Sequence, residues 1–168
     1  MDFVWIGFDK EINIDKVCSF IKEKFNLKEC NEYDLAKHEE LENILKRLKI
    51  DTFMENDVSA FYEIKRNKSE FPLIIEFSSL KDLAIKSRLD IHLAYELSIL
   101  LQCRTIVDGT HFGDDSSEYW DIIFDKGEPF LVDDLSTEFY DDGNGKLKII
   151  RKMNFEELKL DRQNLGNL

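Results

Sequence analysis

The chain has few of the residues that interrupt or crosslink a fold, with two prolines, seven glycines and three cysteines among 168 residues. A hydrophobic fraction of 43% with so little proline and glycine argues against a disordered or low-complexity chain. No apolar run approaches the roughly 18 residues of a membrane span, and Met1-Asp2 is not the basic start of a signal peptide. We therefore expect a single domain over residues 1–168, with residues 160–168 as a polar tail.

The three cysteines, Cys18, Cys30 and Cys103, form no C-x-x-C pair and leave an odd thiol over. Cys18 and Cys103 fall at positions that the hydrophobic pattern places in the core. All three can be reduced, which favours a reducing compartment and a cytoplasmic location.

The motifs that mark common enzyme classes are also missing. The sequence has neither a P-loop nor a G-x-G-x-x-G phosphate-binding turn, and it has no G-x-S-x-G nucleophile elbow. The run Asp142-Gly143-Asn144-Gly145 has the wrong spacing for a calcium loop, so it is interpreted as a turn. We expect no enzyme activity, no cofactor and no bound metal. The alternative is an enzyme or small-ligand pocket near His111, Asp114 and Asp115, where a histidine adjoins two carboxylates.

What the chain does have is acid, concentrated in one stretch. The net charge is −12, and the segment from Asp108 to Gly145 holds twelve of the 35 acidic residues but only one base, Lys126. Such a surface repels nucleic acid and anionic lipid, and it attracts basic proteins. We therefore expect a basic protein partner, no nucleic acid and no membrane. The other interpretation is that these acids only keep the protein soluble.

The first third of the chain predicts one strand and two helices. Phe3–Phe8 is apolar on both alternating faces, as an interior strand is. Asn13 can cap a helix whose apolar stripe extends to Phe25, and a charged amphipathic helix is expected over residues 34–48.

The middle of the chain predicts two strands and a central helix. Val58–Lys65 and Phe71–Phe77 alternate as strands, the second with Phe71, Leu73, Ile75 and Phe77 on one face. A long helix is expected to open at Ser78 and to continue to about Leu101, followed by a strand over residues 103–107. The alternative is a shorter helix that restarts near Asp90.

The acidic segment predicts further strands. Tyr119–Asp125 and Phe130–Val132 form a hairpin through Asp125-Lys126-Gly127, and another strand follows near Leu147–Ile150. Phe155–Leu160 is expected to be a short helix. The fold class is therefore α+β, a ferredoxin-like β-α-α-β-β-α-β core with an antiparallel C-terminal hairpin extension.

Alternation in the first of these strands assigns its two faces. Trp120, Ile122 and Phe124 point to the core, so Tyr119 and Asp121 point outward with the acids, and Tyr119 is the expected aromatic anchor. The residues predicted to contact a partner are Asp114, Asp115, Glu118, Tyr119, Asp121, Asp133, Asp134, Asp141 and Asp142.

Four segments, Leu73–Phe77, Leu93–Leu97, Thr105–Asp108 and Trp120–Gly127, give the chain a resemblance to a known group. Over about residues 71–133 it resembles small cytosolic immunity proteins of bacterial polymorphic toxin systems, including contact-dependent growth inhibition. The resemblance implies a function by inhibition, in which the protein binds a cognate toxin domain, and it carries no catalytic residues over. A basic nuclease toxin would suit the acidic segment. A cytosolic adaptor without an inhibitory role is the further alternative.

Overall fold

The computed structural model describes residues 4–33, 59–78, 88–115, 119–135 and 146–160. Within these ranges the protein is an α+β structure with one mostly antiparallel sheet. Its elements are β1 (Val4–Phe8), α1 (Ile14–Phe25), β2 (Glu29–Glu32), β3 (Ser59–Arg66), β4 (Leu73–Ser78), α4 (Leu89–Leu101), β5 (Arg104–Asp108), β6 (Trp120–Asp125), β7 (Glu128–Asp133) and β8 (Lys148–Lys152).

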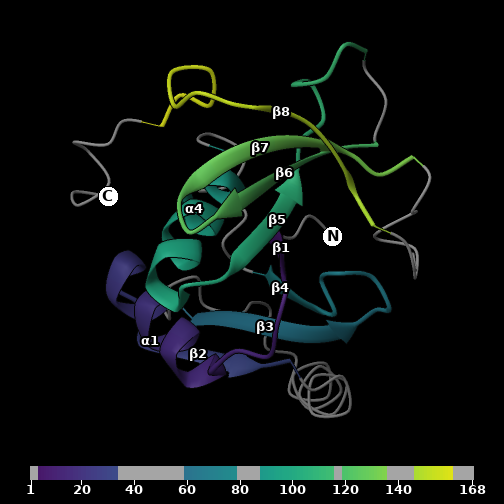
Figure 1. Cartoon of the computed structure of the whole chain (residues 1–168). Coiled ribbons are helices and arrows are strands. Elements are labelled where there is room, and N and C mark those ends of the chain that lie inside the picture. The colour runs from purple at the N-terminus through teal and green to yellow at the C-terminus, as the bar shows by residue number, and fades with distance from the viewer. Residues whose placement is uncertain (1–3, 34–58, 79–87, 116–118, 136–145, 161–168) are drawn as a thin grey trace, which may run out of the picture.

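The eight described strands form one sheet in the order β2-β3-β4-β1-β5-β6-β7-β8 (Figure 1). Every neighbouring pair is antiparallel except β2 and β3, which are parallel. The predicted strands are confirmed with boundaries shifted by a few residues. Strand β2 was not predicted, because Glu29-Cys-Asn-Glu32 is short and mostly exposed and so has no alternating pattern.

Helix α1 begins where the sequence predicts. The Asn13 side chain accepts a hydrogen bond from the Lys16 backbone N–H at 3.1 Å, which satisfies one of the free donors at the helix start. Val17 and Ile21 bury the apolar stripe against the sheet.

Helix α4 is shorter than the long helix predicted from Ser78. Arg88 has left-handed backbone angles, with φ 49°, so the helix does not continue through it and begins at Leu89. The alternative of a helix that restarts near Asp90 is confirmed, and residues 79–87 lie outside the described residues. No helix in the described part of the chain has the length and apolarity needed to cross a bilayer.

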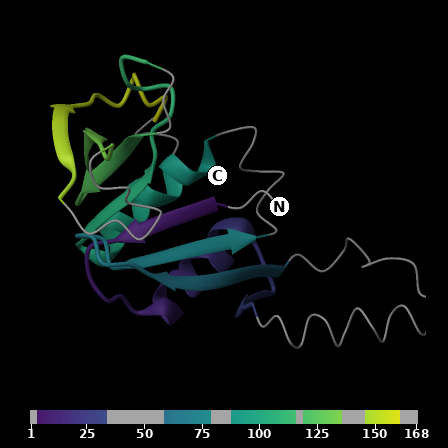
Figure 2. The same ribbon diagram turned by 90° about the vertical axis from the view of Figure 1, so that its right-hand side faces the viewer.

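Both helices pack against the same face of the sheet (Figure 2). Leu93 and Leu97 of α4 are fully buried, whereas Leu101 is only half-buried. They meet the inward side chains of the strands, among them Phe8, Phe77 and Phe124. This cluster is the main core of the protein.

The opposite face of the sheet is also buried in its centre. Ile74, Ile106, Ile123 and Val132 form a second cluster there, together with Phe71 and Leu147. The prediction that Phe71 shares a face with Leu73 is wrong, because Phe71 precedes β4 and packs with Ile74 on the other side. Strands that are covered on both faces explain why β4 is almost continuously apolar.

The hairpin between β6 and β7 has the predicted turn. Lys126 and Gly127 both have positive φ, 48° and 93°, as the two central residues of a type I′ turn require. The predicted helix over Phe155–Leu160 is wrong, because these residues form turns and Leu160 is buried in the core, so the polar tail does not include it. The predicted helix over 34–48 and the turn at 141–145 lie outside the described residues.

Candidate functional site

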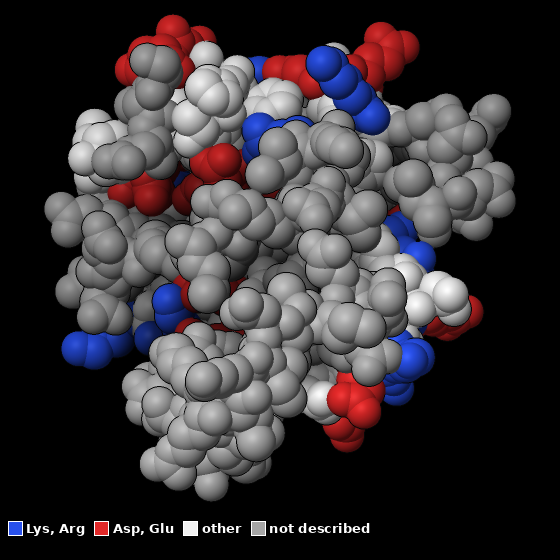
Figure 3. All heavy atoms as spheres, turned by 180° about the vertical axis from the view of Figure 1, so that it is seen from behind, with Lys and Arg blue, Asp and Glu red and all other residues white. Residues whose placement is uncertain are grey.

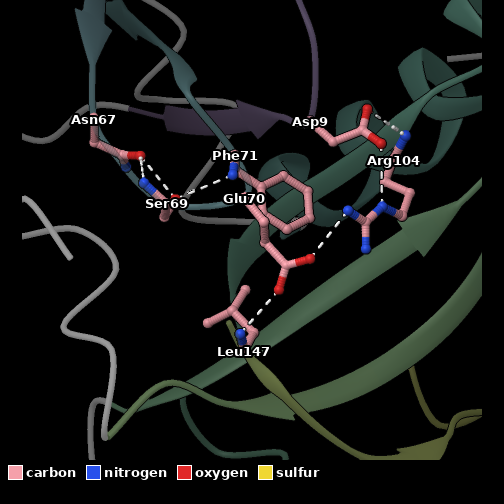
Figure 4. Close-up of polar contacts among 7 residues, drawn as sticks. All are labelled: Asp9, Asn67, Ser69, Glu70, Phe71, Arg104 and Leu147. Atoms are coloured by element: carbon pink, nitrogen blue, oxygen red, sulfur yellow. Dashed lines mark hydrogen bonds and ion pairs between the residues drawn. The ribbon is translucent and has the colours of Figure 1, made fainter. Parts of the chain in front are cut away.

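Two polar clusters lie at opposite ends of β5, and the first surrounds Arg104 at its start. The Arg104 Nε and backbone N–H donate to the two carboxylate oxygens of Asp9, both at 3.1 Å. Its Nη2 donates to Glu70 at 3.1 Å, and the other oxygen of Glu70 accepts the Leu147 N–H at 2.9 Å (Figure 4). One guanidinium therefore links the end of β1, the turn before β4 and the residue that leads into β8.

The turn before β4 is shaped by side chains that hold Glu70 in place. The Asn67 side-chain oxygen accepts hydrogen bonds from the Ser69 N–H and hydroxyl, at 2.9 and 2.7 Å (Figure 4). The Ser69 hydroxyl in turn accepts the Phe71 N–H at 3.0 Å. Such local bonds between side chain and backbone stabilise tight turns.

The charge of Arg104 is balanced by its two carboxylate partners. Burial works against the charge of Arg104, but hydrogen bonds to Asp9 and Glu70 outweigh it and raise the pKa of the guanidinium. The guanidinium also lies over the Phe71 ring, 5.1 Å from its centre. The adjoining hollow of about 270 Å³ is lined by Asp9, Lys10, Gln102, Cys103, Arg104, Asp125 and Lys126. Since two carboxylates already pair with Arg104, this end is organised for structure rather than for capturing an anion.

The second cluster lies where β5 ends, and it is acidic. Asp108 is directly opposite Asp121 in the β5–β6 register. Asp134 lies two residues beyond Val132, which is paired with Asp121, so its side chain belongs to the same face of the sheet. Asp121 and Asp134 are only 4% and 7% exposed. Three carboxylates are thus neighbours on one face, and two of them are buried.

Asp121 is the residue most affected by this arrangement. Burial raises the pKa of its carboxyl well above the usual range, and the charges of Asp134 and Asp108 raise it further. Among the described residues, no donor forms a hydrogen bond or ion pair with the Asp121 carboxyl. Arg88 donates to the Asp108 carbonyl at 2.8 Å and lies 3.7 Å from the Asp108 carboxylate. The charged form of the Asp121 carboxyl is therefore disfavoured in the folded protein.

The prediction that Asp121 points outward with the exposed acids is wrong, and Asp134, another predicted partner contact, is also buried. It assumed that only one face of β6 is covered, so that residues alternating with Trp120 and Ile122 would face solvent. The second face is covered as well, because Ile123 and Val132 belong to the cluster on that side. These two acids are therefore too buried for direct surface contact.

The loop between β5 and β6 positions Asp114 and Asp115, and both are exposed as predicted. Gly109 lets the loop approach β6, since a Cβ there would be 2.7 Å from the Asp121 backbone. Gly113 lies against the Trp120 ring, and the indole N–H donates to Asp115 at 2.7 Å. The loop is therefore folded back over Trp120, whose ring packs on the main core.

Apolar side chains are exposed beside these acids. Tyr119 is 37% exposed and Leu135 is 59% exposed. The Asp134 N–H donates to the Tyr119 carbonyl, so Tyr119 and Asp134 lie opposite each other in the strand pairing. Asp133 is half-buried and accepts the Leu135 N–H at 2.9 Å. Leu135 is a residue that the sequence reasoning did not select, because a single leucine after a run of acids has no periodic signal. Glu118, Asp141 and Asp142 lie outside the described residues.

Basic side chains lie closer to the acidic segment than the sequence indicated. Strand β8 pairs with β7 and has the composition Lys-Ile-Ile-Arg-Lys. Arg151 is held by Glu157, which raises the pKa of the guanidinium, and the charge of Asp114 adds to that shift. Acidic and basic side chains accordingly adjoin one another around the margin in Figure 3. A count along the chain missed this, since the bases follow the acids in sequence but neighbour them in the sheet.

The alternative interpretation was a pocket near His111, Asp114 and Asp115. His111 is exposed and has a positive φ of 82°, within the same loop as Asp114 and Asp115. Within the part of the chain that the structure describes, no group of three or more His, Cys, Asp or Glu side chains is arranged to hold a metal ion.

Comparison of the chain with protein-family models, with curated proteins and with solved structures found no match.

Proposed function

We propose that the protein is a cytoplasmic immunity protein that binds and neutralises a cognate bacterial toxin domain, and that this domain is a basic nuclease. The proposal concerns a binding protein and not an enzyme. The observation that carries it is the combination of exposed acids and exposed apolar side chains at the end of β5, beside the half-buried Asp108 and the buried Asp121 and Asp134.

The proposed contact residues are revised by exposure. Asp114, Asp115 and Asp133 supply negative charge at the surface, while Tyr119 and Leu135 supply apolar contacts. Aromatic anchors surrounded by polar residues are typical of the centre of a protein interface. The half-buried Asp108 at the end of β5 adds to the local negative potential.

A basic partner fits this potential for a kinetic reason as well. Complementary charge steers diffusional encounter and raises association rates, and the effect falls with salt because screening acts over about 8–10 Å near physiological ionic strength. A nuclease must hold a polyanion, so its substrate cleft is basic. An acidic protein that occupies this cleft would block the substrate path.

We also infer that part of the sheet is a ferredoxin-like unit. The antiparallel order β3-β4-β1-β5, with α1 following β1 and α4 following β4 on one face, supports this inference. Strand β2 then extends the unit at one edge, and β6, β7 and β8 extend it at the other.

The first experiment measures binding kinetics against the toxin domain encoded immediately upstream of this chain's gene, in a catalytically inactive form. Asp114→Lys/Asp115→Lys should weaken the complex at least about tenfold, mainly by slower association, and should reduce its salt dependence. Asp114→Lys alone keeps the Asp115–Trp120 hydrogen bond and should show a smaller effect in the same direction.

The matched control is Asp15→Lys/Glu23→Lys on α1, which reverses two exposed acids away from β5 and changes the net charge equally. It should alter affinity by less than about threefold. If both double variants weaken binding equally, the effect is one of net charge, and the proposed surface is wrong. A metabolic operon in place of an upstream toxin gene would remove the proposed function itself.

A separate measurement addresses the alternative at His111. Elemental analysis of the purified protein should find less than one equivalent of zinc or calcium, and chelator should leave the melting temperature unchanged. One equivalent of metal that is lost in a His111→Ala variant would favour the pocket interpretation.

A further inference from the structure

A pair of thiols lies on the other side of the molecule, away from the acidic cluster. Cys18 is in α1 and Cys30 is in β2, and both are half-buried. The chain reverses between them at Asn26, which ends α1 in a left-handed conformation with φ 52°. Cys18 is eight helical residues before this reversal, about 12 Å, and Cys30 is four extended residues after it, about 13 Å. Cys18 and Cys30 are therefore at about the same distance from the chain reversal, one along α1 and the other along β2.

The side chains also point into the same space. Cys30 pairs with the fully buried Ala60 in the β2–β3 register, and its side chain packs against the main core, on the face that α1 covers. Cys18 follows the buried Val17 on α1. Each thiol acts on the pKa of the other as a hydrogen-bonding neighbour, which places the two sulfurs close together.

The two sulfurs have different properties. The hydrogen bond from Cys30 lowers the pKa of the Cys18 thiol, although burial opposes the shift, and Lys22 one turn further along the helix contributes in the same direction. The same hydrogen bond, with burial, raises the pKa of Cys30 strongly. Cys18 is thus the better nucleophile and Cys30 the thiol that holds the proton.

We propose that Cys18 and Cys30 form a redox-active pair that closes reversibly to a disulfide on reaction with a small-molecule disulfide. The Cys18 thiolate attacks one sulfur of the oxidant, forms a mixed disulfide and releases one small thiolate. Cys30 then loses its proton to solvent, attacks the Cys18 sulfur and releases the second small thiolate. The protein loses two protons and two electrons, and the small disulfide is reduced to two thiols. A reducing dithiol reverses the sequence.

The site is independent of toxin binding, and its product has a structural consequence. A Cys18–Cys30 disulfide would fasten β2, at the edge of the sheet, to α1. The third cysteine provides the internal control, because Cys103 is 3% exposed and burial raises its pKa to about 11.

The experiment treats the reduced, folded protein with oxidised glutathione and follows the intact mass, with thiols counted by alkylation after unfolding. Wild type and Cys103→Ser should both lose about 2 Da, and peptide mapping should join Cys18 to Cys30. Cys30→Ser should instead accumulate a glutathione adduct of about 305 Da on Cys18. Cys18→Ser should react at least about tenfold more slowly than Cys30→Ser, because only the thiolate attacks.

The wild-type result is decisive even if a variant folds poorly. Wild-type protein that keeps three free thiols, or that links Cys103 to either partner, would overturn the proposal. Equal adduct formation by the two single variants would overturn the assigned roles of Cys18 and Cys30.

Discussion

Carboxylates lie at both ends of β5, but their neighbours differ: at one end they pair with an arginine, and at the other they lie beside further carboxylates. At the start of the strand, Asp9 and Glu70 share one guanidinium from Arg104, and every contact is a charge-assisted hydrogen bond. At its end, Asp108, Asp121 and Asp134 adjoin one another, and Arg88 contacts only Asp108 among them.

The difference indicates that the Arg104 end of β5 stabilises the fold and that the acidic end opposes folding. A buried charge with partners fixes the geometry around it, whereas like charges buried close together oppose folding. Proteins retain such unfavourable groups mainly where function needs them. The acidic end of β5 is therefore the end proposed to meet a partner.

The largest expected effect comes from the core that both ends share. Helix α4 packs on β1, β5 and β6, and Leu97 is fully buried within that contact. Leu97→Ala should lower the free energy of unfolding by about 2–5 kcal/mol, measured by urea denaturation. Ile99→Ala, at a position that is 40% exposed, should cost less than about 1 kcal/mol. Equal effects would mean that α4 is not central.

The Arg104 end should show the next largest effect. Arg104→Met removes the cation and leaves Asp9 and Glu70 without it, so the free energy of unfolding should fall by about 2–3 kcal/mol. Arg66→Met is the control, since Arg66 pairs with Glu11 and both side chains are more than half exposed, at 56% and 70%. That change should cost less than about 0.5 kcal/mol. A similar loss in both variants would remove the distinction between structural and surface ion pairs.

The acidic end should respond in the opposite direction. Because the pKa of Asp121 is raised in the folded state, the native protein binds a proton that the unfolded chain releases. This group contributes stability that increases as pH falls from the folded pKa towards the ordinary pKa near 4, and that is lost as pH rises.

Asp121→Asn is neutral at every pH, so it should stabilise the protein by about 1 kcal/mol or more at pH 7. The advantage over wild type should shrink as the solution is acidified to about pH 4. Thermal melts of both proteins across this range measure the difference. A destabilising Asp121→Asn at pH 7 would show that the Asp121 carboxylate is favourably partnered, and the contrast between the two ends would fail.

The smallest effect on folding is expected at the exposed rim. Asp114→Lys should change the free energy of unfolding by less than about 0.5 kcal/mol, because its side chain is exposed. A larger loss would place Asp114 among the structural acids, with Asp9 and Glu70, rather than among the binding residues.

The sequence predicted the strands and the helix cap well because these depend on local patterns. The Asn13 cap, the shared core face of Trp120 and Ile122, and the turn at Lys126-Gly127 each depend only on neighbouring residues. The state of Asp121 could not be obtained this way, since it depends on a second buried face. Ile123 was the available signal, an apolar residue on the side that was taken to face solvent.

The candidate site was predicted only in part for a related reason. Asp114, Asp115 and Tyr119 are exposed as expected, but the bases of β8 neighbour the acids only through strand pairing. A turn was mistaken for a helix at Phe155–Leu160, because Leu158 and Leu160 are buried by tertiary contacts and not by helical periodicity.

Strand β8 has a consequence for the behaviour of the protein at high concentration. In the described part of the chain it pairs only with β7, and Ile149 and Ile150 are 58% and 38% exposed. An edge strand with exposed isoleucines is a template on which other chains can assemble into aggregates. Lys148, Arg151 and Lys152 surround the isoleucines with charged side chains, and the register shift opposite Leu131 and Val132 breaks the regular ladder. Charge and irregularity at that margin thus protect the protein from fibrous self-association.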